Sequence, residues 1–375
     1  MHPDTRTLFE GYVAQIAAIN NVSVPHVTAT KFAVNPTVEQ KLEEVIKQGN
    51  EFLGLINISP VIQQSGDKLG LGTTRTIAGR TNTAAGNRRT PTDPTDTSAK
   101  DQYFCRQTNF DTALKYTKID AWRHKAEFQT LIRDSIAKQI GRDRIMIGWH
   151  GTSAAAETDR VANPLLQDVN FGWLYKVRTN APAQVLQDGD LTVYTNGANN
   201  PGLKKIYVKP GVTLFDLSLA NGATAKADYS SLDALVLDAK RLIPEWLRGD
   251  TELVVIVGHD LVDEKYFQIA QTTGATATEV EATDRILRSD KQLGGLPAVR
   301  VPFFPANAVM ITRLDNLSIY FQEGTRRRQV KDEPALDQIE NYESVNEDYV
   351  VEDYELCSLV ENIVIGEAPA RAVAP

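Results

Sequence analysis

One long segment limits what this chain can fold into more than any other feature. Residues 66–102 read GDKLGLGTTRTIAGRTNTAAGNRRTPTDPTDTSAKDQ and are rich in Gly, Thr, Asn and Arg. The segment has few large apolar side chains, so it cannot bury a core of its own, and it is too long for an ordinary connection. Short alternating stretches lie near its start, at 68–71, and just after its end, at 103–105. The pattern predicts a long two-stranded β-arm that projects from the body. An isolated hairpin is marginal in water, so the arm needs another surface to rest on.

Charge is distributed unevenly between this arm and a later segment. Residues 66–118 carry about four more basic than acidic side chains, including Arg75, Arg80, Arg88 and Arg89. Residues 332–355 contain no Lys or Arg and are strongly acidic, and they include Glu347, Asp348, Glu352 and Asp353. A basic arm that cannot fold alone and an acidic extended surface suggest head-to-tail self-association. The alternative, in which both charged faces pair within one chain, remains open at this point.

The overall composition excludes several other classes of protein. The 375 residues carry a formal net charge of −8, which argues against nucleic-acid binding through the bulk field of the protein. Neither a secretory signal nor an apolar run long enough for a membrane span is expected. The two cysteines, Cys105 and Cys357, are too few for a disulfide framework or a cysteine-rich zinc site.

Apolar periodicity predicts the order of the elements. Residues 1–32 form an accessory segment with a helix over 5–20, and a second helix follows near 42–53. A long helix is expected over 119–149, with Asp120 as its N-cap. In the α/β section, helices are expected over 165–177 and after Ser230 or Ser231, the latter ending near Pro244. Strands are expected at 253–257, 298–301 and 308–312, and residues 314–365 are mainly extended.

The search for catalytic chemistry yields one weak candidate. The chain has no phosphate-binding loop and no G-x-S-x-G motif. His259 and Asp260 end a predicted buried strand and Asp263 follows, at a position where α/β enzymes place their sites. A solvated turn with a helix N-cap explains the same residues better, so an enzyme built on them is the less favoured alternative. The basic run at 326–328 suits an intersubunit or hairpin-tip role better than nucleic-acid binding.

Five longer segments carry a resemblance to a known family. They are NPLLQDVNFGWLYKVRTNAPAQV from Asn163, DYSSLDALVLDA from Asp228, LVVIVGHDLVDEKYF from Leu253, LPAVRVPFFPANAVMITRLDNLSIYF from Leu296 and ENYESVNEDYVVEDYELCSLVENI from Glu340. Together they closely resemble the major capsid proteins of P2-like tailed bacteriophages. The similarity is collinear from the N-terminal helix to about Gly366, and it is weakest over 186–227 and in the tail.

The resemblance implies an α+β architecture, the HK97-type capsid fold. Such a fold has an N-terminal arm, a long β-hairpin E-loop, a peripheral domain with a spine helix, and an axial α/β domain. The order of the predicted elements agrees with it. The implied division is an N-terminal arm 1–50 with a removable segment 1–32, an E-loop region 51–118, a spine helix 119–150, an axial domain 151–312, peripheral strands 313–366 and a disordered tail 367–375.

The resemblance also implies a function. The chain would be a structural protein without enzymatic activity or cofactor, located in the virion capsid after assembly in the host cytoplasm. Its partners would be further copies of itself in pentamers and hexamers, a scaffolding protein that carries a protease, a portal protein, and packaged double-stranded DNA bound without sequence specificity; no membrane is implied. A cargo-enclosing nanocompartment of the same fold, as in encapsulins, is the alternative.

Two sets of residues follow from this implied function. Trimming of the N-terminus by the protease is expected around Phe32 and Ala33, where the accessory segment meets the body. The E-loop arginines Arg75, Arg80, Arg88 and Arg89 are expected to contact Glu347, Asp348, Glu352 and Asp353 of the adjacent subunit. The lysine–asparagine crosslinking of some relatives of the fold is not expected.

Overall fold

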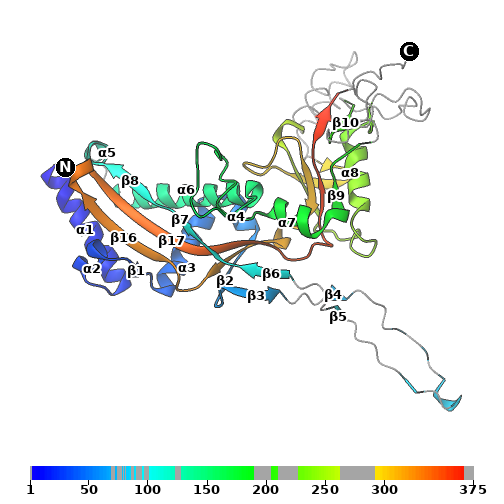
Figure 1. Cartoon of the computed structure of the whole chain (residues 1–375), viewed down its shortest axis with the longest axis horizontal. Helices are drawn as coiled ribbons and strands as arrows, with labels where there is room; N and C mark the ends of the chain where they lie inside the picture. Colours follow the sequence, from blue (N-terminus) through cyan, green and yellow to red (C-terminus); the bar gives the residue numbers. More distant parts are fainter. Residues whose placement is uncertain are drawn as a thin grey trace, which may run out of the picture.

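Two lobes and a projecting arm make up the described part of the chain (Figure 1). The computed structural model describes residues 2–68, 72–73, 78, 80, 82–85, 88–89, 95–96, 101–122, 128–189, 204–209, 227–261 and 292–366. The first lobe is an elongated ribbon of strands with helices along it, and the second is a smaller sheet with one packed helix. Helices and sheets both contribute to the core, so the predicted α+β class is confirmed.

Strand β17 (Gln338–Val351) is the axis of the first lobe. Along one edge it pairs antiparallel with β16 (Arg327–Glu333) and then with β15 (Leu317–Gln322). Along its other edge it pairs with β8 (Thr112–Lys115) and β7 (Arg106–Asn109). Strand β2 (Asn57–Val61) joins β15 in parallel. Leu317, Ile319 and Phe321 alternate with more polar residues and are all buried, so the period of two fixes which face of β15 meets the core.

Helix α6 (Phe128–His150) lies along this ribbon (Figure 1). Its C-terminal end carries Trp149, which belongs to an aromatic cluster. It contacts α3 (Pro36–Gln48) and α7 (Trp173–Asn180), and α4 (Glu51–Leu55) completes the layer. The Trp149 and Trp173 ring centroids are 4.9 Å apart, and Phe52 lies 5.6 Å from Trp149. A Cβ on Gly148 would lie 2.2 Å from the Trp173 ring, so only glycine permits this approach of α7 to α6.

Two helix predictions need correction. The long helix expected over 119–149 falls on α5 (Tyr116–Trp122) and α6, and the residues between them, 123–127, lie outside the described residues. Asp120 is not an N-cap: it lies inside α5, and its carboxylate accepts the His2 backbone N–H at 3.1 Å. The helix predicted over 165–177 begins only at Trp173. The preceding residues form turns, because Leu166 has a φ of 58°, which a right-handed helix cannot contain.

The second lobe is a six-stranded sheet with the order β12-β13-β11-β14-β18-β9. Its strands are β12 (Gln292–Leu293), β13 (Leu296–Val299), β11 (Val254–Val257), β14 (Val309–Thr312), β18 (Ser358–Val360) and β9 (Val185–Leu186), beside a parallel pair formed by β10 (Ile206–Val208) and β19 (Ile363–Ile365). Helix α8 (Leu232–Arg241) packs against this sheet. The Ser231 hydroxyl accepts the Ala234 backbone N–H at 3.2 Å, which confirms the predicted cap.

The first residues form a compact unit on the far end of the ribbon. Helix α1 (Pro3–Asn20), helix α2 (Val24–Ala29) and strand β1 (Phe32–Ala33) pack onto β16. Val13, Ile16 and Val27 of the two helices bury against Val330 and Ile339 of the ribbon. The predicted amphipathic helix near the N-terminus is therefore confirmed, and it packs on its own chain.

The arm is an antiparallel pair over its described parts. Strand β3 (Ser65–Lys68) pairs with β6 (Asp101–Phe104), and β4 (Gly72–Thr73) pairs with β5 (Thr95–Asp96) farther out (Figure 1). A single helical turn (Thr83–Ala85) lies farther still along the arm. The arm ends at Phe104, and the later residues up to 118 belong to the body as β7, β8 and the start of α5. The tail predicted at 367–375 lies outside the described residues.

Candidate functional site: the arm, the acidic strand and the N-terminal unit

The distal part of the arm presents arginines to solvent. Arg80, Arg88 and Arg89 are all exposed, while Arg75 lies outside the described residues. None of the three makes an ion pair with any residue that the structure describes. Guanidinium groups that stay charged and unpaired can bind carboxylates in two-pronged fashion. This end of the arm is therefore a cationic surface that the described part of its own chain leaves unused.

The base of the arm, in contrast, is held firmly to the body. The Phe104 backbone N–H donates to the Asp348 carboxylate at 3.1 Å. The Tyr103 and Tyr320 rings meet edge to face with centroids 5.3 Å apart. A Cβ on Gly66 would lie 2.9 Å from the Tyr103 ring, so glycine allows this ring to cross the opposite strand. These contacts fix the direction in which the arm leaves the body.

Two of the four acids predicted to face a neighbouring subunit are buried inside their own chain. Glu347 is 0% exposed and its carboxylate pairs with Arg144. Asp348 is 1% exposed, and both of its oxygens accept from the Lys176 ammonium, at 2.8 and 2.9 Å. Because the two carboxylates are enclosed and already paired, this structure offers neither of them to an arm from another copy. The cations that pair with these two carboxylates come from α6 and α7 of the same chain and not from the basic segment at 66–118.

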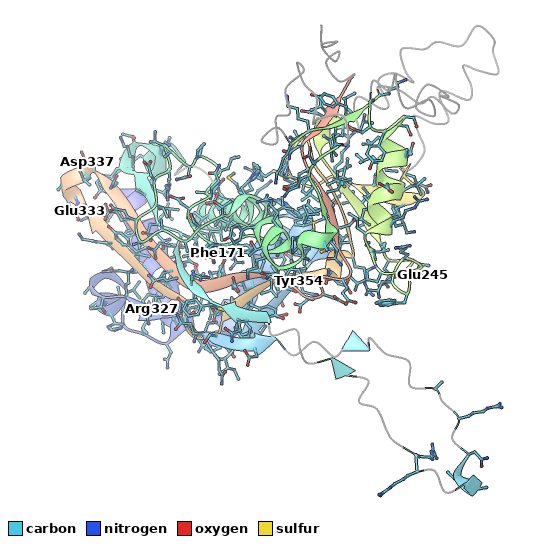
Figure 2. All side chains as sticks on the ribbon, turned by 45° about the vertical axis from the view of Figure 1, so that its right-hand side comes forward. Phe171, Glu245, Arg327, Glu333, Asp337 and Tyr354 are labelled. Atoms are coloured by element: carbon cyan, nitrogen blue, oxygen red, sulfur yellow. The ribbon has the colours of Figure 1, made fainter. Side chains whose placement is uncertain are left out.

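The other two predicted acids are partly accessible. Glu352 is half-buried and accepts the Tyr320 hydroxyl at 2.9 Å. Asp353 is also half-buried, and its carboxylate accepts the Glu355 backbone N–H at 2.8 Å. A further acidic group, which includes the half-buried Glu333 and the exposed Asp337, gathers at the turn between β16 and β17 (Figure 2). Acidic side chains therefore lie near both ends of strand β17. Only the exposed and half-buried ones among them can contact another molecule.

Glu347 belongs to a buried ionic cluster that sequence reasoning did not find. Two guanidinium groups, Arg144 and Arg326, meet four carboxylates, and all six side chains are buried; the carboxylates are those of Glu39, Glu43, Glu343 and Glu347. The Arg144 Nη1–Glu43 Oε2 distance is 2.6 Å and the Arg144 Nε–Glu347 Oε1 distance is 2.9 Å. The only sequence signal was a charged residue among apolar neighbours on α6, which periodicity alone does not separate from a surface residue.

Burial and the two guanidinium groups shift the pKa values of these carboxyls in opposite directions. Burial raises the pKa of Glu347, although Arg144 opposes the shift. Burial likewise raises the pKa of Glu39, with Arg326 opposing. Burial also acts on Glu43, but Arg144 and Arg326 together outweigh it and lower the pKa of that carboxyl. Since the cations come from α6 and the β15–β16 connection and the acids from α3 and β17, the cluster fastens these four elements together.

The predicted proteolytic junction lies inside a strand. Phe32 and Ala33 pair with Arg328 and Arg327 of β16, and the Phe32 side chain is 4% exposed. The neighbouring Val34 N–H donates to the Arg326 carbonyl at 2.9 Å. A protease binds its substrate as a free extended segment, so this junction must leave β16 before it can be cut.

The remaining sequence candidates are placed as follows. His259 and Asp260 are solvent-exposed, with Nδ1 and Oδ1 3.6 Å apart, and Asp263 lies outside the described residues. Of the basic run, Arg326 is buried in the ionic cluster, and Arg328 donates to the Tyr12 hydroxyl at 2.8 Å. Only Arg327 is exposed, so the run does not form a basic patch (Figure 2). In the described residues, no group of His, Cys, Asp or Glu is arranged to hold a metal ion.

Comparison with known proteins gives a consistent result. The model of the family described as "Phage major capsid protein, P2 family" matches residues 8–363. The chain is 42% identical to "Capsid proteins" of Escherichia phage P2, over 100% of this chain and 99% of that protein. It is 36% identical to the "Major capsid protein" of Serratia phage KSP20, over 97% of each.

A solved structure agrees with these relatives. The chain is 40% identical to a chain of the "Satellite phage P4 procapsid including size determination (Sid) protein", with a TM-score of 0.74 over 98% of this chain and 99% of that one. Within its described residues, every helix of the present chain is too short or too polar to traverse a lipid bilayer.

Proposed function

This chain belongs to the P2 family of phage major capsid proteins, and we propose that its arm is the element that joins one copy to the next in the shell. The chain has the HK97-like fold and is a shell-forming structural protein of the virion capsid. Because membership of this family accounts for the whole chain, no observation favours a nanocompartment or an enzyme built on His259.

The observation that carries the proposal is the contrast between the two ends of the arm. Its base is fixed by Asp348 and Tyr320, whereas Arg80, Arg88 and Arg89 stay exposed and unpaired among the described residues. A rigid base and an unused cationic end suit an arm that reaches over a neighbour. We propose Glu352 and Asp353 of the adjacent copy as its acidic partners, together with the acidic turn at Asp337. Each exposed pair contributes only about 0–1 kcal/mol, and repetition around the shell multiplies it.

The arm proposal is tested by charge reversal at its far end. The double variant Arg88→Glu/Arg89→Glu is compared with wild type by negative-stain electron microscopy, each co-expressed with the cognate scaffolding protein. We expect wild-type shells and, from the variant, unassembled subunits or broken shells. Arg133→Glu, an exposed arginine paired with Asp134 on α6, is the control and assembles normally. Normal shells from the double variant contradict the proposal.

We further propose that assembly uses pentamers and hexamers, takes place in the host cytoplasm, and requires a scaffolding protein and a portal. A solved relative is a procapsid that includes a second protein, which supports the idea of an assembly partner. The finished shell would enclose double-stranded DNA without sequence-specific contacts, consistent with the net charge of −8. Co-purification of DNA from particles that resist nuclease tests this last point.

Trimming near Phe32 and Ala33 is proposed as a maturation step. Strand β1 marks the boundary between the N-terminal unit and the body, and cleavage there requires β1 to separate from β16. N-terminal sequencing of protein taken from mature particles is expected to begin at or next to Phe32. A sequence that begins at Met1 rules out the step.

A further inference from the structure

A groove of about 520 Å³ lies between α4, α6 and the loop at 299–303. Its floor includes the buried side chains of Phe52 and Ile145. Its edges carry Leu55, which is 48% exposed, and Phe303, which is 39% exposed. Clefts of this volume with apolar walls are the usual binding places for small ligands and single peptide segments. Phe52 also packs on Trp149 and Val299 belongs to β13, but Leu55 and Phe303 at the edges take no part in the contacts described above.

The charge of the groove is positive. Lys138, Arg142 and Arg300 line it and are exposed, and Glu51 is the single acid among the lining residues. Neither Lys138 nor Arg142 forms an ion pair with any described residue. Arg144, on the same helix, is by contrast fully enclosed by Glu43 and Glu347. The groove thus presents two cations, Lys138 and Arg142, that form no ion pair in the described part of the chain, above an apolar floor.

At the edge of the groove, the backbone of Phe303 has a strained conformation that places its aromatic ring there. Phe303 has a φ of 63°, an unfavourable value for a bulky side chain. Its carbonyl is hydrogen-bonded to His150 Nε2 at 2.7 Å, so the end of α6 holds the loop in this conformation. Strained residues of this kind concentrate at ligand-binding sites, where the surrounding structure maintains them. The result is a partly exposed ring beside two unpaired cations.

We propose that this groove receives an apolar segment with acidic residues from the scaffolding partner. The inference rests on the proposed need for that partner. A segment whose apolar residues meet Leu55 and Phe303 and whose carboxylates meet Lys138 and Arg142 complements both properties of the groove. The phosphates of a DNA backbone would match the cations of the groove but not its apolar floor. A contact of one segment is small, which suits a partner that must later leave the shell.

Site-specific photo-crosslinking identifies the occupant. The photoreactive amino acid p-benzoylphenylalanine replaces Leu55 in one variant and Leu336 in another, each co-expressed with the cognate scaffolding protein. Leu336 is 60% exposed but lies at the turn between β16 and β17, away from the groove. We expect mass spectrometry of purified shells to show a scaffold adduct at an acidic, apolar peptide from position 55 only. Adducts to a second capsid-protein copy or to DNA, equal adducts from both positions, or no adduct overturn the proposal.

Charge reversal provides a second, independent measurement. Lys138→Glu/Arg142→Glu is compared with Arg133→Glu, which lies on the same helix outside the groove. Removing two exposed attractions and adding repulsion is expected to weaken scaffold binding about tenfold, measured as the scaffold content of sedimented shells. An unchanged content refutes the docking site. If wild type and scaffold form no shells at all, the proposed function fails instead, so the two failures are distinguishable.

Discussion

Replacing Arg144 with methionine tests the idea that the buried ionic cluster holds the first lobe together. Arg144 is 0% exposed and donates to Glu43 from two nitrogens, at 2.6 and 2.9 Å, and to Glu347. Methionine keeps much of the length of the side chain but removes every donor. Both carboxylates then stay buried without their main partner, while Arg326 still contacts Glu43.

The expected loss of stability follows from this geometry. Breaking a buried ion pair by removing one partner costs about 3–5 kcal/mol, because an uncompensated charge stays behind. A typical domain is stable by only about 5–15 kcal/mol. We therefore expect the variant to lose a large part of the stability of its first lobe. Arg133→Met, an exposed position on the same helix, is expected to change stability by less than about 0.5 kcal/mol.

The pH dependence distinguishes a charge effect from a packing effect. Burial raises the pKa of Glu347 above its ordinary value near 4.5, so the folded state binds that proton more tightly than the unfolded chain does. The stability from such a group is complete below its unfolded pKa and is lost as the pH rises through the raised value. Arg144 lowers the pKa of both carboxyls, so without it the raised pKa of Glu347 rises further and the pKa of Glu43 rises from its lowered value. The deficit of Arg144→Met is therefore expected to shrink as the pH falls from neutral.

Urea unfolding of the unassembled subunit, followed by far-ultraviolet circular dichroism at several pH values, measures this deficit. If Arg144→Met matches Arg133→Met at neutral pH, the cluster does not stabilise the lobe and the reasoning fails. A deficit that is the same at every pH assigns the loss to packing and refutes the electrostatic part. The triple variant Arg144→Met/Glu43→Gln/Glu347→Gln is expected to recover part of the loss, because no carboxylate is left without its cation.

Three further predictions concern single positions. Ser231→Ala removes the cap of α8 and is expected to cost about 1 kcal/mol, measured by urea unfolding. Gly148→Ala places a methyl group 2.2 Å from the Trp173 ring and is expected to prevent soluble expression, whereas Gly54→Ala, with open space around it, is tolerated. Burial, with Asp348 and Glu347 nearby, raises the pKa of Cys105 to about 12, so its thiol is expected to react with Ellman's reagent at pH 8 only after denaturation; reaction of the native protein contradicts this.

The features that could be read from the sequence are those set by local pattern. The arm at 66–102 was predicted because its residues cannot bury a core. Strand β11 and strand β15 followed from an apolar run and from alternation, and Ser231 from the preference of serine for helix starts. In each case the interactions that determine the element lie between residues close together in the sequence, so the local sequence is enough to predict it.

The errors have a different origin. Asp120 has the residue type of a cap, but its partner, the His2 N–H, is remote in sequence and becomes available only when α1 packs on α5. The helix predicted over 165–177 starts late because Leu166 is held at a positive φ by surrounding turns. Local propensity is a weak influence, and tertiary contacts override it at such positions.

The sequence by itself determined the order of elements, the projecting arm and the surplus of acid over base. Tertiary structure alone decided which charged side chains are buried in ion pairs within the chain. Glu347, Asp348 and Glu352 belong to the same acidic segment at 332–355, yet the first two are enclosed and pair with Arg144 and Lys176, while Glu352 stays partly accessible. Burial of a charge depends on which distant cation folding brings to it, because an unpaired charge cannot be taken out of water. That partner is not a property of the local sequence, so the surface left for assembly emerges only with the fold.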